Sequence, residues 1–491
     1  MKFITLRFNV RSGVIFAGVI LSLLLIMQWG MVWHQVNDPK TQPSGDEGDY
    51  YQRAIYLVKN GSFLPATEYD REVLAEKRFG YGNIRTPGYP AFLAAMALDE
   101  PPLFTLRKRA ALIQFILAAL CVVFLFCFSI SVSDNLSGIL AVAIILGIQP
   151  WSFELVGSLH SDSLAMSLVT LGTMGLSLFS VADKNKIATI ILAGSMVFLC
   201  GSFTVRPEMI VLVPLLCLVA LLLRTRNIAQ ITKYSCVSLL IFSLFVGINV
   251  AYRLQIDRKF AIFGKFSHIS PGLHSWSKTW IGTEHMRERA VYNGYKGLYN
   301  EYATLPDRIF TDADEQKTIL NAFNELAQKK TYNTAIDSLF SNIAERRKNN
   351  NWVANVFLVK LWNMVNLWVN TNTNNQLLEV LAPLQGSVRK VILLFLLIHR
   401  ISVLCFAAVS LLRCLIMKCN NMQSATADLL ILCGALVIGR TLLIGGYIGE
   451  YLHRYMIPSW PAMLWCGVYT VLTICGKKTS ELSWGKNRPS S

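Results

Sequence analysis

Long apolar segments recur along most of the chain, and they constrain its fold more than any other feature. A helix needs about 20 apolar residues to cross the hydrocarbon core of a bilayer. Within that core a single helix satisfies its own backbone hydrogen bonds. We therefore predict an all-α integral membrane protein with about ten transmembrane helices, external amphipathic helices and one large external loop region. The predicted spans are 10–33, 110–131, 137–153, 163–181, 187–203, 208–223, 235–252, 390–415, 427–446 and 456–475.

The composition supports a membrane protein and argues against a nucleic-acid partner. Hydrophobic residues make up 53% of the chain and charged residues 15%, whereas soluble domains carry about 25% charged residues. The net charge is +16, but the Lys and Arg residues gather at the ends of apolar segments. That distribution follows the orientation rule for membrane proteins. Membrane lipids are therefore the expected surroundings, and nucleic acid is not an expected partner.

Basic residues also predict the orientation of the chain. Lys2, Arg7 and Arg11 precede the first span, and Lys477 and Lys478 follow the last. An even number of spans places both ends in the cytoplasm, as this charge pattern requires. We expect a multi-pass protein of the bacterial inner membrane, with its active site facing the periplasm.

The segment 352–370 is apolar but carries Lys360 and several asparagines at helical spacing. It is either an eleventh span or a helix lying in the membrane interface. An eleventh span would place the C-terminal lysines outside the cell, so the interfacial interpretation is favoured.

Three regions follow from this pattern. Residues 1–252 form a transmembrane catalytic module that contains a first external loop at 35–108. Residues 253–388 form a large external region, and residues 389–491 form the last spans and a cytoplasmic tail. Within the first loop, 49–60 reads as a surface helix and 88–98 as an apolar helix on the membrane.

An acidic run, Gly45-Asp46-Glu47-Gly48-Asp49-Tyr50-Tyr51, lies just beyond the first span. Carboxylates beside a membrane are costly, so they indicate function. Asp46, Tyr50, Ala54 and Leu57 have a D-x-x-x-Y-x-x-x-A-x-x-L spacing. This spacing resembles the first external loop of the GT-C glycosyltransferases, a family that includes protein mannosyltransferases and aminoarabinose transferases.

Further motifs extend the resemblance over the N-terminal half of the chain and its last external turn. Arg85-Thr86-Pro87-Gly88-Tyr89-Pro90 resembles the element that ends the first loop in that family. Other similar elements are Ser161-Asp162-Ser163-Leu164, Arg206-Pro207-Glu208 and Arg454-Tyr455-x-x-Pro458.

The resemblance implies an inverting hexosyltransferase that uses a polyprenyl-phosphate-linked sugar. Its acceptor would be a cell-surface glycan or glycolipid such as lipopolysaccharide O-antigen, by analogy with phage-borne serotype-conversion glucosyltransferases. The alternatives are an O-antigen or polysaccharide polymerase and a transporter of lipid-linked sugars. A transporter should show internal repeats and polar residues near the midplane of its spans, and neither is evident.

Glycosyl transfer from a phosphate needs one carboxylate base and cations for the leaving group. Asp46 is the candidate base, and its alternative role is a helix N-cap. Asp162 could orient the acceptor or share a divalent metal with Asp46, or it could cap the helix that follows. No cofactor is specified by the pattern, and a divalent metal stays open.

Arg206 and Arg454 are candidate ligands of the phosphate. Their alternative partners are the neighbouring carboxylates Glu208 and Glu450. Four further residues are expected to contact substrate, namely Arg85, Tyr50, Tyr89 and Glu47. For Arg85 the alternative is to anchor the loop. For Glu47, as for Asp49, the alternative is a solvent-facing or capping role.

Two more features leave alternatives open. Trp276 and Trp280, in a stretch that also holds His268, His274 and His285, form either a stacking platform for the acceptor or an interfacial aromatic belt. Arg107-Lys108-Arg109 falls outside the cell in this topology, against the orientation rule. Either this run binds lipid headgroups, or the predicted topology is wrong at this point.

Overall fold

The fold is known from a computed structural model of the chain. It describes residues 12–37, 45–64, 86–130, 136–148, 156–257, 260–262, 271–280, 305, 307–329, 334–369, 386–418, 425–448 and 453–475. No strand occurs among these residues, so the expectation of an all-α protein is confirmed for the part of the chain they cover.

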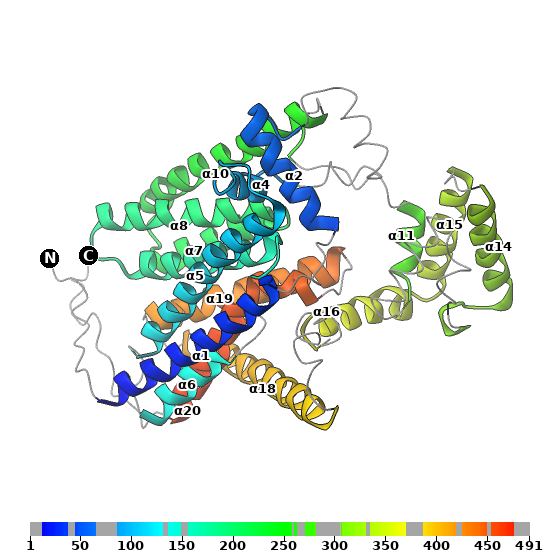
Figure 1. Ribbon diagram of the computed structural model, residues 1–491. Coiled ribbons are helices and arrows are strands. Elements are labelled where there is room, and N and C mark those ends of the chain that lie inside the picture. The colour runs from blue at the N-terminus through cyan, green and yellow to red at the C-terminus, as the bar shows by residue number, and fades with distance from the viewer. Residues whose placement is uncertain are drawn as a thin grey trace.

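A bundle of apolar helices forms the larger part of the molecule (Figure 1). By length and composition, 6 helices among the described residues could cross a membrane, and four shorter apolar helices accompany them. A multi-pass membrane protein is therefore confirmed, while ten crossings stay a prediction. The bundle helices are α1 (Ser12–Asn37), α5 (Leu103–Ile130), α6 (Leu136–Gly147), α7 (Ser161–Val181), α8 (Asn185–Val205), α9 (Met209–Arg224), α10 (Ile228–Asp257), α18 (Gly386–Lys418), α19 (Ala425–Thr441) and α20 (Trp460–Cys475).

Helix α7 lies at the centre of the bundle and packs closely against α8. A side chain at Gly175 would collide with the Ser195 hydroxyl, and one at Gly172 would collide with Leu199. Small residues at such contacts allow membrane helices to approach closely. The outer helices instead expose large apolar side chains to the surroundings, as α10 does with Leu240 and Leu244. That pattern is typical of helices that face lipid.

Two short helices cover one end of the bundle, which we call the α2 end. They are α2 (Gly45–Asn60) and α4 (Gly88–Ala94). A separate apolar core joins them to the helix ends beneath and includes Tyr50, Tyr89 and Leu159. The predicted surface helix at 49–60 is confirmed and begins four residues earlier, whereas the predicted helix at 88–98 ends at Ala94.

Asn60-Gly61 ends α2. Gly61 has φ +61°, a left-handed conformation that glycine adopts without steric strain and that commonly ends helices. Its backbone N–H donates to the Leu57 carbonyl at 3.0 Å.

A small helical unit stands apart from the bundle and includes α11 (Pro271–Ser277), η3 (Asp307–Ile309), α14 (Ala313–Lys329) and α15 (Thr334–Asn350) (Figure 1). Trp276, Trp280, Phe323 and Phe340 lie in its core. Trp276 is 0% exposed and Trp280 is 5% exposed. Neither the stacking platform nor the aromatic belt predicted for these two tryptophans is therefore correct, because their rings hold the unit together.

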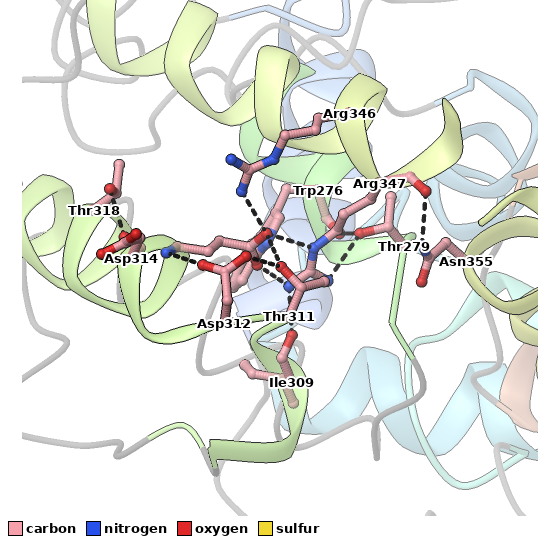
Figure 2. Close-up of polar contacts among 11 residues, drawn as sticks. Trp276, Thr279, Ile309, Thr311, Asp312, Asp314, Thr318, Arg346, Arg347 and Asn355 are labelled. Atoms are coloured by element: carbon pink, nitrogen blue, oxygen red, sulfur yellow. Dashed lines mark hydrogen bonds and ion pairs between the residues drawn. The ribbon is translucent and has the colours of Figure 1, made fainter. Parts of the chain in front are cut away.

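A buried ion pair ties α14 to α15 in this unit. Glu315 is fully buried and pairs with Arg347, which is also buried, and with the half-exposed Arg346 (Figure 2). Thr311 adds a hydrogen bond to the same carboxylate at 2.7 Å. Burial opposes ionisation of Glu315, but the hydrogen bonds from Arg347 and Thr311 outweigh it and lower the pKa of the carboxyl group.

The segment predicted to lie in the membrane interface connects the helical unit to the bundle. It forms η4 (Val353–Leu358) and α16 (Val359–Val369). One side of α16 packs on η5 (Leu442–Ile448) and η6 (His453–Ser459). There Trp368 Nε1 donates to Thr441 Oγ1 at 2.9 Å. Elsewhere the segment exposes large apolar side chains, which include Trp352, Phe357, Leu361 and Val365. An interfacial position of this segment stays a prediction.

Candidate functional site

The α2 end gathers buried charged residues from helix ends that are far apart in the sequence. Glu47 and Asp49 of α2 are 2% and 5% exposed. The interpretation of these two carboxylates as solvent-facing is therefore wrong. Burying a carboxylate in this way requires partners, and each of them has an arginine.

Glu47 joins α2 to the start of α5 and to the turn before α7. Its Oε1 accepts a hydrogen bond from the Leu159 backbone N–H at 2.8 Å and lies 3.7 Å from Arg107 Nε. Arg107 also donates to the Gly157 carbonyl at 2.7 Å. These contacts let Glu47 hold the turn on α2, and its predicted contact with substrate stays a prediction.

The side chains of the basic run Arg107-Lys108-Arg109 all contact other residues of the protein. Arg109 forms two hydrogen bonds to the Asp99 carboxylate, at 2.5 and 2.7 Å. Lys108 lies over the rings of Trp33 and Phe104. Arg107 is thus a buried partner of Glu47, and Lys108 and Arg109 attach the start of α5 to neighbouring residues. Binding of lipid headgroups by this run stays a prediction.

Tyr50 and Tyr89 meet in the core beneath α2. Their rings pack edge to face with centroids 4.8 Å apart. The Tyr50 hydroxyl donates to Ser161 Oγ at 3.2 Å, and the Tyr89 hydroxyl donates to Gln114 Oε1 at 3.4 Å. Burial raises the pKa of Tyr89 well above its ordinary value. Both tyrosines are buried, so they fix α2 and α4 on the bundle, and direct contact with substrate stays a prediction.

The element that ends the first loop is fixed against the end of α8. Thr86 Oγ1 donates to the Val205 carbonyl at 3.0 Å. A Cβ on Gly88 would lie 2.7 Å from the backbone carbonyl carbon of Thr204. Only glycine permits this approach, so the end of the loop is held one residue away from Arg206.

Two carboxylates and two guanidinium groups alternate beside this contact, and we call them the charge quartet: Asp162, Arg206, Glu208 and Arg440. Arg206 Nη2 is in direct contact with Asp162 Oδ1. Glu208 Oε1 lies 3.8 Å from Arg206 Nε and accepts a hydrogen bond from Arg440 Nη2 at 3.0 Å. The quartet is electrically balanced and joins the start of α7, the turn between α8 and α9, and the end of α19.

The two arginines of the quartet favour the ionised form of Glu208 despite its burial. Burial opposes ionisation of Glu208, but the guanidinium groups of Arg206 and Arg440 outweigh it and lower the pKa of the carboxyl group. Asp162 lies in the first turn of α7, where the helix dipole also favours a negative charge. His160 occupies the N-cap position of α7 and makes no side-chain capping hydrogen bond. Asp162 is therefore not the N-cap, and its partner is Arg206.

A second group of polar side chains joins α2 to the end of α10. Arg53 Nε lies 3.3 Å from Asp49 Oδ1, and Arg53 Nη1 donates to the Tyr252 hydroxyl at 3.2 Å. All three side chains are buried. They fasten the middle of α2 to the end of α10.

Three predicted site residues fall wholly or partly outside the described residues. Asp46 is part of α2, one turn before Tyr50, but its side chain lies outside the description. Arg454 is likewise part of η6 without a described side chain, and Arg85 lies outside the described residues altogether. Their predicted roles therefore stay predictions, as does the pairing of Arg454 with Glu450, which also lies outside.

Sequence reasoning missed Arg440 and Gln114. Arg440 is 0% exposed near the end of the apolar helix α19. Gln114 is buried in α5, where it accepts from Tyr89 and donates to the carbonyl groups of Val156 and Ser158. Both could have been found in the sequence as a charged or amide residue within a predicted span, because such residues indicate a functional or structural role.

Metal binding was left open by the sequence. Within the part of the chain that the structure describes, no group of three or more His, Cys, Asp or Glu side chains gathers as a metal site would. The quartet nevertheless offers two carboxylates and a guanidinium group that is partly exposed, which is chemistry suited to an anion and to a hydroxyl group.

Comparison with known proteins adds no family. No protein-family model matches the chain, and no curated protein matches it. Functional conclusions therefore depend on the geometry of the α2 end.

Proposed function

We propose that the chain is an inverting membrane glycosyltransferase of the GT-C type. It would transfer a hexose from a polyprenyl-phosphate carrier to a cell-surface glycan such as lipopolysaccharide O-antigen, on the periplasmic face of a bacterial inner membrane. The observation that carries the proposal is the contact of Arg206 with Asp162 beside the hydrogen bond of Tyr50 to Ser161. Through these contacts the acidic helix, the start of α7 and a cationic turn meet at one end of an apolar bundle.

The position of this end suits a lipid-linked donor. A polyprenyl chain dissolves in the bilayer and presents its phosphate at the membrane surface, which is where the ends of membrane helices lie. The charge quartet is formed by such ends, at the start of α7, after α8 and at the end of α19. Arg206 can form two parallel hydrogen bonds to a phosphate, which lysine cannot.

The proposed reaction is a single displacement. Asp46 accepts the proton of the acceptor hydroxyl as its oxygen forms a bond to the anomeric carbon of the donor. The bond between that carbon and the phosphate oxygen breaks, and the polyprenyl phosphate leaves with the electron pair. Arg206, with Arg454 and Arg85 as further proposed ligands, neutralises the charge that develops on the leaving phosphate.

The rest of the α2 end holds these groups in place. Glu47, Tyr50 and Arg53 fix the first half of α2 at three points, through Arg107, Ser161 and Tyr252. A base held on a helix fixed in this way keeps one position relative to Arg206, and fixed geometry is what makes proton transfer effective. The large external region 253–388, which includes the helical unit, is proposed to shape the acceptor site.

A reconstituted assay tests the proposal. The purified protein is placed in lipid nanodiscs with polyprenyl-phosphate-linked glucose, and an O-antigen oligosaccharide is supplied as acceptor. We expect transfer of one hexose with inversion at the anomeric carbon, and inhibition by free polyprenyl phosphate. Transfer from a nucleotide-linked sugar without any lipid donor would show that the proposed donor class is wrong.

A further inference from the structure

Arg206 already has an anionic partner where the donor phosphate is proposed to bind. Its Nη2 is in direct contact with Asp162, and its Nε lies 3.8 Å from Glu208. A phosphodiester carries one negative charge, as a carboxylate does. A phosphate that binds Arg206 must therefore either add a third negative charge to a balanced quartet or replace one of the carboxylates.

The two carboxylates differ in how firmly they are held. Glu208 has a second cation, because Arg440 donates to its Oε1 at 3.0 Å. Arg440 is itself 0% exposed, so removing the Glu208 carboxylate would leave a buried positive charge without this partner, which is strongly destabilising. Among the contacts described, Asp162 pairs with Arg206 and with no second cation. Its replacement leaves the pair of Glu208 and Arg440 intact.

Arg206 and Glu208 are the partly exposed members of the quartet, although Nε and Nη2 of Arg206 are themselves buried. The Arg206 side chain is 11% exposed and that of Glu208 10%, whereas Asp162 is 3% exposed and Arg440 0%. A ligand arriving from the surface meets Arg206 before it meets Asp162. Glu208, which Arg440 holds in place, then stays beside the guanidinium group of Arg206 while Arg206 exchanges Asp162 for the phosphate.

We infer that Asp162 occupies the donor-phosphate position on Arg206 and is displaced when a lipid-linked phosphate binds. The inference rests on the proposed function and names the step by which the donor enters. The displaced carboxylate stays on the first turn of α7, beside Ser161. There it can accept a hydrogen bond from the acceptor hydroxyl, so donor binding prepares the acceptor site.

The step predicts an unusual effect for a residue of the active site: its removal should tighten binding. With Asp162→Asn the incoming phosphate no longer competes with a carboxylate, while the amide retains the shape of the side chain. We expect the dissociation constant for polyprenyl phosphate to fall by about tenfold, in the range of coupling measured for close charge pairs. Turnover should fall at the same time, because the acceptor loses the carboxylate.

The test measures equilibrium binding of undecaprenyl phosphate to the full-length protein in nanodiscs. Asp99→Asn is the matched control, since it removes a carboxylate that pairs with Arg109 on the exposed surface of the same end. It should leave the dissociation constant unchanged. The double variant Asp162→Asn/Arg206→Gln replaces both charges with amides of similar shape, and it should lose the gain and bind more weakly than the wild type.

Each outcome has a definite meaning. Tighter binding by Asp162→Asn alone supports displacement. Equal or weaker binding by this variant, with normal binding by the wild type, overturns displacement and leaves the proposed donor class intact. If neither protein binds undecaprenyl phosphate, the donor class is wrong and the inference is overturned with it. Equal tightening by Asp99→Asn would assign the effect to net charge, which also contradicts displacement at Arg206.

Discussion

Arg440 Nη2 donates to Glu208 Oε1 at 3.0 Å, although the two residues are 232 positions apart in the sequence. This bond fastens the end of α19 to the turn between α8 and α9. It also supports Arg206, which is two residues before Glu208 and lies in the same quartet. The arrangement of the proposed phosphate site thus depends on an arginine that contacts it through a carboxylate.

Breaking this pair from one side should destabilise the protein strongly. Glu208→Gln leaves Arg440 buried without its carboxylate, a change that costs about 3–5 kcal/mol in comparable cases. The double variant Glu208→Gln/Arg440→Met removes both charges and should recover most of that loss. Thermal unfolding of the detergent-solubilised protein measures both. Equal losses in the single and the double variant would contradict the coupling.

The same pair makes stability depend on pH. The pKa of Glu208 is lowered from 4.5 in the folded protein, so ionised Glu208 favours folding. Its contribution is fully present above about pH 4.5 and is lost as the pH falls through the lower pKa of the folded state. The unfolding temperature of the wild type should therefore fall on acidification through this window. In Glu208→Gln/Arg440→Met the fall should be smaller.

Gly88 should not tolerate even one added methyl group. A Cβ there would lie 2.4 Å from Thr204 Oγ1 and 2.7 Å from the Thr204 backbone, and the backbone cannot move cheaply. Gly88→Ala should destabilise by about 1–3 kcal/mol or displace α4. Gly48→Ala is the control, because nothing lies within 4 Å of the equivalent Cβ in α2. Unfolding temperatures that drop equally in both would contradict the close approach.

The hydrogen bond of Tyr50 to Ser161 should act mainly in positioning α2. Tyr50→Phe keeps the edge-to-face contact with Tyr89 and removes only the hydroxyl, so we expect a loss of about 0.5–1.5 kcal/mol. Ser161→Ala should cost a similar amount, and the double variant no more than either. Additive losses from the two changes, measured by thermal unfolding, would show that the two hydroxyls do not act together.

The external helical unit should unfold separately when its ion pair is broken. Glu315→Gln leaves Arg347 buried without its carboxylate, at a cost of about 3–5 kcal/mol. Arg346→Gln is the matched control, because that side chain is 51% exposed and exposed pairs contribute about 0–1 kcal/mol. Limited proteolysis should cut α14 and α15 rapidly in Glu315→Gln only. Equal cleavage of the control would contradict a buried role for the pair.

The sequence predicted the helices of the bundle well, because a span is a local property of about 20 consecutive residues. It also singled out Asp162 and Arg206 as candidate site residues, a role that stays a prediction. It could not predict that these two residues pair with each other, since that depends on how α7 and α8 pack. Arg440 was missed for the same reason: its partner Glu208 is distant in the chain and near only in the fold.

Other differences have a simple physical origin. In the sequence, Trp276 and Trp280 fit a stacking platform, an interfacial belt or a small core equally well. Only the packing of these rings with Phe323 and Phe340 in the fold shows that they belong to a core. Glu47 and Asp49 read as surface residues because carboxylates are seldom buried. Arg107 and Arg53, which come from one and the same end of the bundle, supply the charges that permit their burial.

The most direct test of the central claim is the mass of O-antigen from a lipopolysaccharide-producing host that expresses the chain. The same host expressing Asp46→Asn at equal membrane level is the comparison. We predict one added hexose per repeat with the wild type and none with the variant, as transfer with Asp46 as base requires. Unchanged repeat mass with an altered chain length in the wild type would contradict glycosyl transfer and favour a polymerase.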